Sequence, residues 1–460
     1  MNKTMNLMTC EGTEDSSSSS SSSSSATPSS PSAAAKLNVR ECLNLGSYNY
    51  LGFADDWEST CRKDVMASHA AYPTSLCTSS AEGGYTALHR ELELTVAEYV
   101  GKEAACVFNM GWATNALGLP ALFGGKGNLI ISDSLNHNSI VAGSRTTGAV
   151  VRVFRHNDMG SLQALLRAAI RDGQERTHRP WRRIVVAVEG IYSMEGEFCA
   201  LADIVRIAKA HKAYVYLDEA HSIGATGPTG RGVCEKYGVD PAHVDILMGT
   251  FTKSFGAMGG YIAASRAVVQ WVKTRSAGFL TDNAMAPAVA QQVLTSLRVM
   301  RGLDGTDTGR RKLAALRDNS NYFRQRLIDM GCEVLGDPDS PVIPLLIYSP
   351  PKVAAFSRAC LERGVSGSAR AAGAGAAAGA AGAGAAPSQR APPTPHSPSP
   401  THPPLPCSLF QPCRWLWWWW ASLPPPCSLP GRASVCLLGT GARTWTGPWW
   451  CWRRLWTSSS

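Results

Sequence analysis

The sequence predicts an α/β protein whose large domain contains a mostly parallel β-sheet covered by helices, followed by a smaller α/β domain. The first observation is the alternation of short apolar runs with helical patterns from about residue 104 to 264, which is the order that builds parallel sheets. The second is that polar candidate residues repeatedly follow an apolar run. Because parallel strands end along one edge of a sheet, we expect these side chains to meet there.

The chain divides into four segments by composition. Residues 1–36 are a Ser-rich leader that cannot bury a core and is expected to be disordered. We predict the large domain over 37–305 and a partial small domain over 306–365. Residues 366–460 are a low-complexity tail with no lysine and no acidic residue, and we expect this tail to be disordered.

Apolar runs bounded by turn residues predict the strands, and apolar side chains spaced three or four residues apart predict the helices. The predicted strands are 105–108, 128–133, 150–154, 183–189, 214–218, 244–248 and 259–264 in the large domain, and 332–335 and 342–348 in the small one. The predicted helices are 88–100, 161–171, 201–211, 268–275, 288–301, 313–330 and 352–363, and two more open after 109 and 135.

The composition argues against several classes of function. The formal charge of +9 comes mainly from the tail, because residues 1–365 contain 37 basic and 35 acidic residues, and this gives no case for nucleic-acid binding. The 14 cysteines form no C-x-x-C pair, so no metal site is expected and reduced thiols are favoured. No apolar run is long enough to predict a membrane-spanning helix, and the N-terminus lacks the pattern of a signal peptide.

The stretch Gly249–Gly256, G-T-F-T-K-S-F-G, places a lysine directly behind an apolar strand. Small and hydroxyl residues surround Lys253. An amine held in a pocket loses hydration, which favours its neutral and nucleophilic form. The alternative is a surface lysine on a turn, and the stretch alone does not separate the two.

A second stretch, Tyr214–His221, reads Y-V-Y-L-D-E-A-H and carries Asp218 to the end of a strand. An acid at this edge can pair with a protonated ring nitrogen. A lysine that forms an imine and an acid that pairs with a pyridinium are the two protein groups that pyridoxal phosphate (PLP) needs most. Lys253 and Asp218 together therefore favour a PLP site.

Other candidates also follow strands. Gly111 and Trp112 open a helix, and a helix N-terminus with a glycine can seat a phosphate. His137 is either a residue of a helix cap or a ring that stacks on an aromatic ligand. Ser193 lies in a turn at another strand end. Asn49, between two tyrosines, belongs either to a packed aromatic turn or to a substrate contact.

Five motifs together resemble the α-oxoamine synthases, a family of fold-type-I PLP enzymes, and among them the members that make sphingoid bases. They are G-S-Y-N-Y-L-G-F-A, S-D-S-L-N-H-N-S-I, V-E-G-I-Y-S-M-E-G, Y-L-D-E-A-H-S-I-G-A-T-G-P-T-G-R-G and G-T-F-T-K-S-F-G-A-M-G-G-Y-I. The resemblance covers about residues 40–365. It implies fold type I and a PLP-dependent acyl transfer that condenses L-serine with palmitoyl-CoA, releases carbon dioxide and gives 3-ketosphinganine.

The resemblance also implies a role for each candidate residue. The residues that would act on the ring are Lys253 as Schiff-base lysine and general base, Asp218 at the pyridine nitrogen, His221 at the phenolic oxygen and His137 stacked on the ring. The residues that would hold the phosphate or lie beside the cofactor and substrate are Thr250, the backbone at Gly111 and Trp112, Ser193 and Asn49.

By the same resemblance the chain would pair with a homologous subunit that lacks the lysine, at the cytosolic face of the endoplasmic reticulum membrane, with the cytoplasm as the alternative. The segment 279–287 differs from the family, and Thr281 is its nearest candidate for a phosphate contact across the dimer. The family's N-terminal membrane helix is not found. The tail from 366 replaces the region that supplies a carboxylate-binding arginine, and we interpret it as a mistranslated or alternatively spliced end.

Two alternatives remain at this point. One is another α-oxoamine synthase that uses glycine or alanine. The other is a truncated, non-catalytic product that binds a partner subunit.

Overall fold

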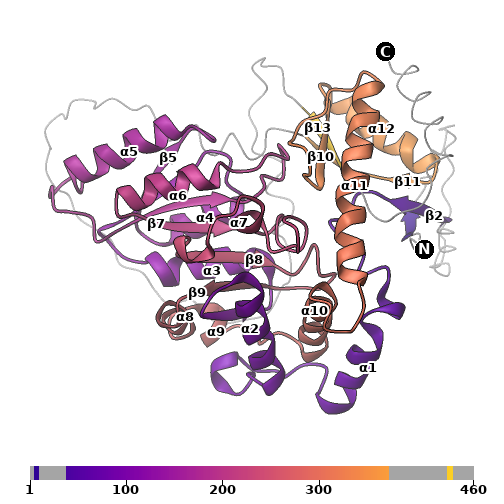
Figure 1. Cartoon of the computed structure of the whole chain (residues 1–460), viewed down its shortest axis with the longest axis horizontal. Helices are drawn as coiled ribbons and strands as arrows, with labels where there is room; N and C mark the ends of the chain where they lie inside the picture. Colours follow the sequence, from indigo (N-terminus) through magenta and orange to yellow (C-terminus); the bar gives the residue numbers. More distant parts are fainter. Residues whose placement is uncertain (1–4, 10–37, 372–432, 439–460) are drawn as a thin grey trace, which may run out of the picture.

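The computed structural model describes residues 5–9, 38–371 and 433–438. Its centre is a seven-stranded sheet with the strand order β3-β9-β8-β7-β6-β4-β5 (Figure 1). The strands are β3 (Ala104–Phe108), β4 (Asn128–Asp133), β5 (Val150–Phe154), β6 (Arg183–Glu189), β7 (Tyr214–Asp218), β8 (Ile246–Thr250) and β9 (Gly260–Ala264). Neighbouring strands from β8 through to β5 are parallel, and only β9 runs antiparallel to β8 and β3. The predicted mostly parallel sheet is confirmed.

Helices cover both faces of this sheet. The helices of the described residues, including α11 and α12 of the smaller unit, are α1 (Arg62–Ala71), α2 (Ala87–Val100), α3 (Gly111–Phe123), α4 (Asn138–Thr146), α5 (Met159–Asp172), α6 (Leu201–Ala210), α7 (Val233–Lys236), α8 (Arg266–Lys273), α9 (Ala277–Leu280), α10 (Pro287–Met300), α11 (Thr308–Asp329) and α12 (Pro350–Glu362). Short 3-10 turns are η1 (Trp57–Ser59), η2 (Ser80–Glu82) and η3 (Pro241–His243).

The strands are apolar along their whole length because both of their faces are buried. In β6, Val186 and Val188 pack into a core cluster shared with α2, α5, α6 and α10, whereas Val185 and Ala187 pack into the opposite cluster with α3, α4 and α8. Successive side chains of a strand point to opposite faces, so this alternation places one hydrophobic layer on each side of the sheet.

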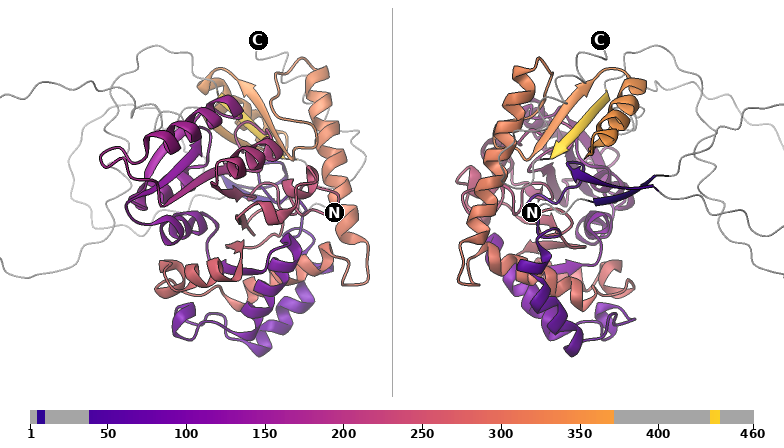
Figure 2. Two further views of the ribbon diagram at one scale, coloured as in Figure 1. Left: turned by 60° about the vertical axis from the view of Figure 1, so that its left-hand side comes forward. Right: turned by 90° about the vertical axis from the view of Figure 1, so that its right-hand side faces the viewer.

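A third cluster joins the long helix α11 to β10 (Val342–Ile347) and α12. It contains Phe323 and Leu327 from α11, Ile343 and Leu345 from β10, and Val353 from α12. Figure 2 shows this unit beside the large sheet. Asp337 links the two parts, because it accepts a hydrogen bond from the Phe198 N–H at 2.8 Å. The domain boundaries stay a prediction.

The predicted strand 332–335 is wrong. Only an isolated bridge forms, between Val334 and Leu345. The facing residue Pro344 has no N–H to donate, and Gly336 then turns the chain with φ +93°. The strand predicted at 244–248 is shifted, because β8 pairs up to Thr250 with Gly260 of β9.

Short segments in the predicted leader and tail form strands. They are β1 (Met5–Thr9), which pairs with β2 (Asn38–Asn44), then β11 (Val365–Ser366), which pairs with β2, and β12 (Ser368–Ala371) and β13 (Ala433–Leu438), which join β10. Over these residues the chain differs from the expected disorder, because their backbones pair with strand edges. The remaining leader and tail residues lie outside the described ranges. Among the residues that the structure describes, none of the helices has both the length and the apolar character that a bilayer crossing requires.

Replacing Gly249 by alanine is expected to lower the free energy of unfolding by about 1–3 kcal/mol. A Cβ at Gly249 would lie 2.5 Å from the ring of Tyr261, which is 1% exposed and has no room to move. Thermal or urea unfolding measures the effect. Gly160→Ala on the exposed first turn of α5 is the control, with an expected change of at most about 0.5 kcal/mol. Equal stability of the Gly249 variant and the wild type would contradict this packing.

Candidate functional site

The carboxyl ends of four neighbouring strands carry the predicted polar residues to one edge of the sheet. Glu189 ends β6, and Asp218 ends β7 and pairs with Glu189 in the strand register. His137 follows β4, while Lys253 follows β8. His137, Asp218, His221 and Lys253 lie near enough to this edge for their charges to act on one another.

Lys253 lies half-buried behind β8. Its Nζ is 5.9 Å from the ring centroid of Tyr48, which presents an aromatic face to the amine. Loss of hydration lowers the pKa of Lys253, and the nearby carboxylates of Asp218 and Glu189 offset part of this effect. The amine therefore loses its proton more readily than an exposed lysine does.

His221 is buried, and its Nδ1 lies 2.7 Å from the hydroxyl of Tyr50. The ring also meets the edge of Tyr48, with 5.4 Å between the centroids. Burial holds the pKa of His221 well below its ordinary value, and the positive charges of Lys253 and His137 add to the effect. The imidazole is therefore neutral at physiological pH.

Asp218 is 3% exposed, and each of its oxygens accepts a hydrogen bond. Asn115 Nδ2 donates to Oδ2 at 2.7 Å, and the Ala220 N–H donates to Oδ1 at 2.8 Å. Sequence reasoning missed Asn115, although a polar residue one helical turn after Gly111 is a detectable signal. It also missed Tyr48 and Tyr50 as neighbours of His221.

Glu189 is a second buried carboxyl at this edge. Burial raises the pKa of Glu189 well above its ordinary value, and the charge of Asp218 adds to the rise. Its Oε1 accepts a hydrogen bond from the backbone N–H of His137. Sequence reasoning missed Glu189 as well, even though it ends an apolar strand as Asp218 does.

The N-terminus of α3 can hold an anion. Met110, the residue before the helix, makes no side-chain cap bond, so the N–H groups of the first turn have no side-chain acceptor there. A Cβ at Gly111 would lie 3.1 Å from Thr250 Cγ2 and 3.3 Å from the Gly259 carbonyl oxygen, so only glycine leaves this space open. Thr250 is buried beside it, whereas Trp112 is 47% exposed.

Other predicted residues lie elsewhere around the site. Asn49 is buried, and its Oδ1 accepts from the Ala54 N–H at 3.4 Å within its own turn. Ser193 is half-buried in the turn after β6. Thr281 is exposed at the end of α9, where its hydroxyl donates to the Ala277 carbonyl. In the part of the chain that the structure describes, no three His, Cys, Asp or Glu side chains are grouped to hold a metal ion.

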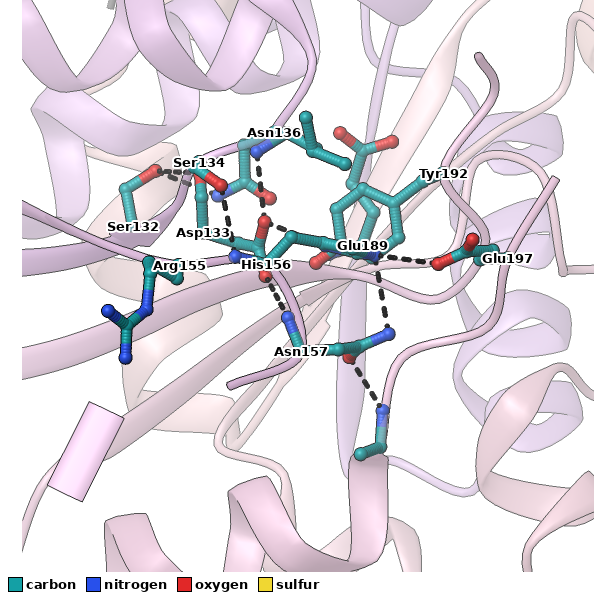
Figure 3. A network of polar contacts seen from close by, with 12 residues as sticks. Ser132, Asp133, Ser134, Asn136, Arg155, His156, Asn157, Glu189, Tyr192 and Glu197 are labelled. Carbon is teal, nitrogen blue, oxygen red and sulfur yellow. Dashed lines mark hydrogen bonds and ion pairs between the residues drawn. The ribbon is translucent and has the colours of Figure 1, made fainter. Parts of the chain in front are cut away.

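Figure 3 shows a neighbouring network centred on His156. The ring nitrogens lie 2.9 Å from Asp133 Oδ1 and 3.3 Å from Glu197 Oε2, and the ring packs edge-on against Tyr192. Burial disfavours the charged ring, but the bonds and charges of Asp133 and Glu197 outweigh burial and raise the pKa of His156. The network ties the ends of β4 and β5 to the loop after β6.

His156→Gln is expected to lower the free energy of unfolding by about 1–3 kcal/mol near pH 6, where the ring is charged in the folded protein. Because the folded pKa lies above the ordinary value of 6.5, this contribution is complete below 6.5 and is lost as the pH rises through the folded pKa. Urea unfolding at several pH values measures the difference. His211→Gln, whose ring bonds to the Ile207 carbonyl, is the matched control. A difference that grows toward alkaline pH would contradict this ion pairing.

Comparison with known proteins gives a family and close relatives. The family Aminotransferase class I and II matches residues 40–371. Long chain base biosynthesis protein 2a of Oryza sativa subsp. japonica is 56% identical over 329 residues, covering 72% of this chain and 67% of the relative. Serine palmitoyltransferase 2 of Dictyostelium discoideum is 53% identical, covering 71% and 66%. Serine palmitoyltransferase 3 of Homo sapiens is 48% identical, covering 71% and 59%. The chain thus spans about two thirds or less of the length of these relatives.

Solved structures share the fold. The serine palmitoyltransferase of Sphingomonas wittichii superimposes with a TM-score of 0.70 at 24% identity, covering 92% of this chain and 88% of that one. The S. paucimobilis enzyme, solved with a PLP adduct of myriocin, gives 0.71 at 22% identity, covering 92% and 89%. The predicted fold type I of PLP-dependent enzymes is confirmed.

Proposed function

This chain belongs to the aminotransferase class I and II family, and we propose that it is a PLP-dependent serine palmitoyltransferase. The reaction condenses L-serine with palmitoyl-CoA, releases carbon dioxide and free coenzyme A, and gives 3-ketosphinganine. The observation that carries the proposal is the half-buried Lys253, with its lowered pKa, at the strand edge that also holds Asp218 and His221. Relatives named serine palmitoyltransferase, 48% and 53% identical, support the choice of reaction.

The residues at the strand edge fit PLP. The cofactor carries a phosphate, a ring nitrogen that can be protonated, a phenolic oxygen and an aldehyde. The open first turn of α3 at Gly111 and Trp112, with Thr250 beside it, suits the phosphate. Asp218 is an acceptor for a ring N–H, the neutral His221 can donate to the phenolic oxygen, and the amine of Lys253 suits the aldehyde.

When bound, PLP supplies an electron sink that makes the α-carbon of an amino acid acidic. The side chains of the chain perform the remaining tasks. The two donors to Asp218 stabilise its anion, so that this carboxylate keeps a neighbouring ring nitrogen protonated. The lowered pKa of Lys253 leaves part of its amine neutral, and the neutral amine can take the proton from the α-carbon of serine.

Two further residues shape the surroundings in the proposal. His137, at the exposed start of α4, offers a ring face for stacking. The Tyr50 hydroxyl holds Nδ1 of His221, and when it donates, the imidazole proton lies on Nε2. Ser193 is proposed to lie beside the cofactor, and Asn49 near the substrate carboxylate. Thr281 is proposed to contact the phosphate of the cofactor that is bound in a second subunit.

We also propose a partner and a location. The chain would form a heterodimer with a homologous subunit that lacks the lysine, at the cytosolic face of the endoplasmic reticulum membrane. The large domain would span 37–305 and the small one 306–365, with the low-complexity segments outside them.

Turnover with different substrates tests the proposal. The purified chain, alone and co-expressed with a lysine-less homologue, is given PLP, labelled serine, glycine or alanine, and either palmitoyl-CoA or a short acyl-CoA. The proposal predicts a long-chain ketone and carbon dioxide from serine with palmitoyl-CoA. Turnover only with glycine or alanine would favour another α-oxoamine synthase. Partner binding without turnover of any amino acid would favour a non-catalytic role.

A further inference from the structure

A single buried amide connects two of the proposed cofactor contacts. Asn115 lies on the second turn of α3 and is 1% exposed. Its Nδ2 donates to Asp218 Oδ2 at 2.7 Å and to Ser139 Oγ at 2.9 Å. Its Oδ1 accepts from the hydroxyl of Tyr216 at 2.6 Å. The amide thus makes three hydrogen bonds to two other elements, because Asp218 and Tyr216 lie on β7 and Ser139 lies on α4.

The chemistry of the neighbours fixes the orientation of this amide. An ionised Asp218 can only accept, so it must face the NH₂ group of Asn115. Burial holds the pKa of Tyr216 well above its ordinary value, so the phenol keeps its proton and donates to the amide oxygen. If the amide were flipped, its oxygen would face the Asp218 carboxylate and its NH₂ group would face the hydroxyl of Tyr216, so both bonds would be lost.

The same amide acts on His137 through Ser139. Because Ser139 Oγ accepts from Asn115, its own proton is free to point to His137 Nδ1, 2.7 Å away. The Ser139 N–H also donates to this Nδ1, at 3.2 Å. With two donors directed at it, Nδ1 must be the unprotonated nitrogen, so the neutral ring carries its proton on Nε2.

The hydrogen bonds of Asn115 connect two site residues that the sheet itself does not join. Asp218 ends β7, and His137 follows β4, and β6 lies between these two strands in the sheet. Backbone pairing therefore does not join the two residues directly. The helix that carries Asn115 also opens with Gly111, at the proposed phosphate seat, so α3 sets the distance between three contacts.

We propose that Asn115 is a positioning residue, whose amide aligns the Asp218 carboxylate with the cofactor ring and, through Ser139, selects the Nε2–H form of His137. This inference rests on the proposed function and extends it to a residue that touches neither cofactor nor substrate.

Asn115→Leu tests the proposal, because leucine has a similar size but cannot form a hydrogen bond. PLP binding to the full-length chain is expected to weaken by about 10–100-fold, which is the effect of removing a hydrogen bond to a charged group. A ring that holds its proton less well withdraws fewer electrons. The pH midpoint of the visible absorption of bound PLP should therefore rise by about one unit.

The matched control is Asn128→Leu. Asn128 is equally buried, and its amide donates to the carbonyl of Phe123 at the opposite edge of the sheet. Both variants are expected to lose stability, but only Asn115→Leu should change the affinity for PLP and the absorption midpoint. If Asn115→Leu and Asn128→Leu have the same affinity for PLP and the same absorption midpoint, Asn115 has only a structural role and the proposal is wrong.

Nitrogen NMR of the histidine rings tests, without cofactor, whether Asn115 and Ser139 determine which ring nitrogen of His137 carries the proton. In the full-length apoprotein, His137 should show the Nε2–H form, and His137→Gln identifies its signals. Ser139→Ala and Asn115→Leu should each shift this tautomer equilibrium. Ser139→Ala also serves if the leucine variant does not fold. Unchanged His137 signals in the folded variants would overturn the proposal, whereas a wild type that binds no PLP would overturn only the proposed function.

Discussion

Lys253→Met is expected to reduce the formation of 3-ketosphinganine by at least about 10⁴-fold, since the variant lacks both the amine that attaches the cofactor and the base that takes the α-proton. Methionine keeps a flexible apolar stem and lacks only the terminal amine, so the space near Tyr48 stays largely filled. The measurement is product formation from labelled serine, together with thermal unfolding to show that the variant is folded.

The control is the same substitution at Lys236. This lysine is half-buried as well, where it lies over the ring of Phe198 at 4.5 Å and pairs with Asp339 at 3.4 Å. Lys236→Met is expected to keep full activity. Comparable turnover by the Lys253 variant and the wild type would show that the amine at this strand edge has no part in the reaction.

Asp218→Asn is expected to reduce kcat/KM by about 10²–10³-fold with little change in the fold. An uncharged amide cannot stabilise a protonated ring nitrogen. It would also turn an NH₂ group toward Asn115 or Ala220, which already donate to this position. Steady-state kinetics and PLP affinity measure the loss.

Asp240→Asn is the matched control for the acid. Asp240 is exposed and accepts a hydrogen bond from the Ala242 N–H at the start of η3. The Asp240→Asn substitution should leave kcat/KM unchanged. If Asp218→Asn retained wild-type kinetics, the carboxylate would not be paired with the cofactor ring.

The sheet and part of the candidate site could be predicted from the sequence because they follow from local patterns. Asp218 is visible because it ends an apolar run, and Lys253 because it follows the next one. The rule that parallel strands end at one edge then brings them together. A short stretch of sequence is enough for each of these inferences.

The contacts across the chain could not be predicted in this way. Asn115 and Asp218 are 103 residues apart, and Tyr50 and His221 are 171 apart, so no local pattern links either pair. Glu189 has the right position but gives no sign of how strongly burial raises its pKa. At 332–335 a local pattern instead predicts a strand that does not form. The apolar residues fit the pattern, but Pro344, which faces Leu335, has no N–H to donate.

The identification of the reactive lysine is the most direct test of this account. The full-length protein is incubated with PLP and treated with borohydride, which makes the link between an amine and the cofactor permanent, and the peptides are then mapped by mass spectrometry. We predict a single pyridoxyl group, on the peptide that contains Lys253. A label on another lysine, or none on a folded protein, would contradict the account.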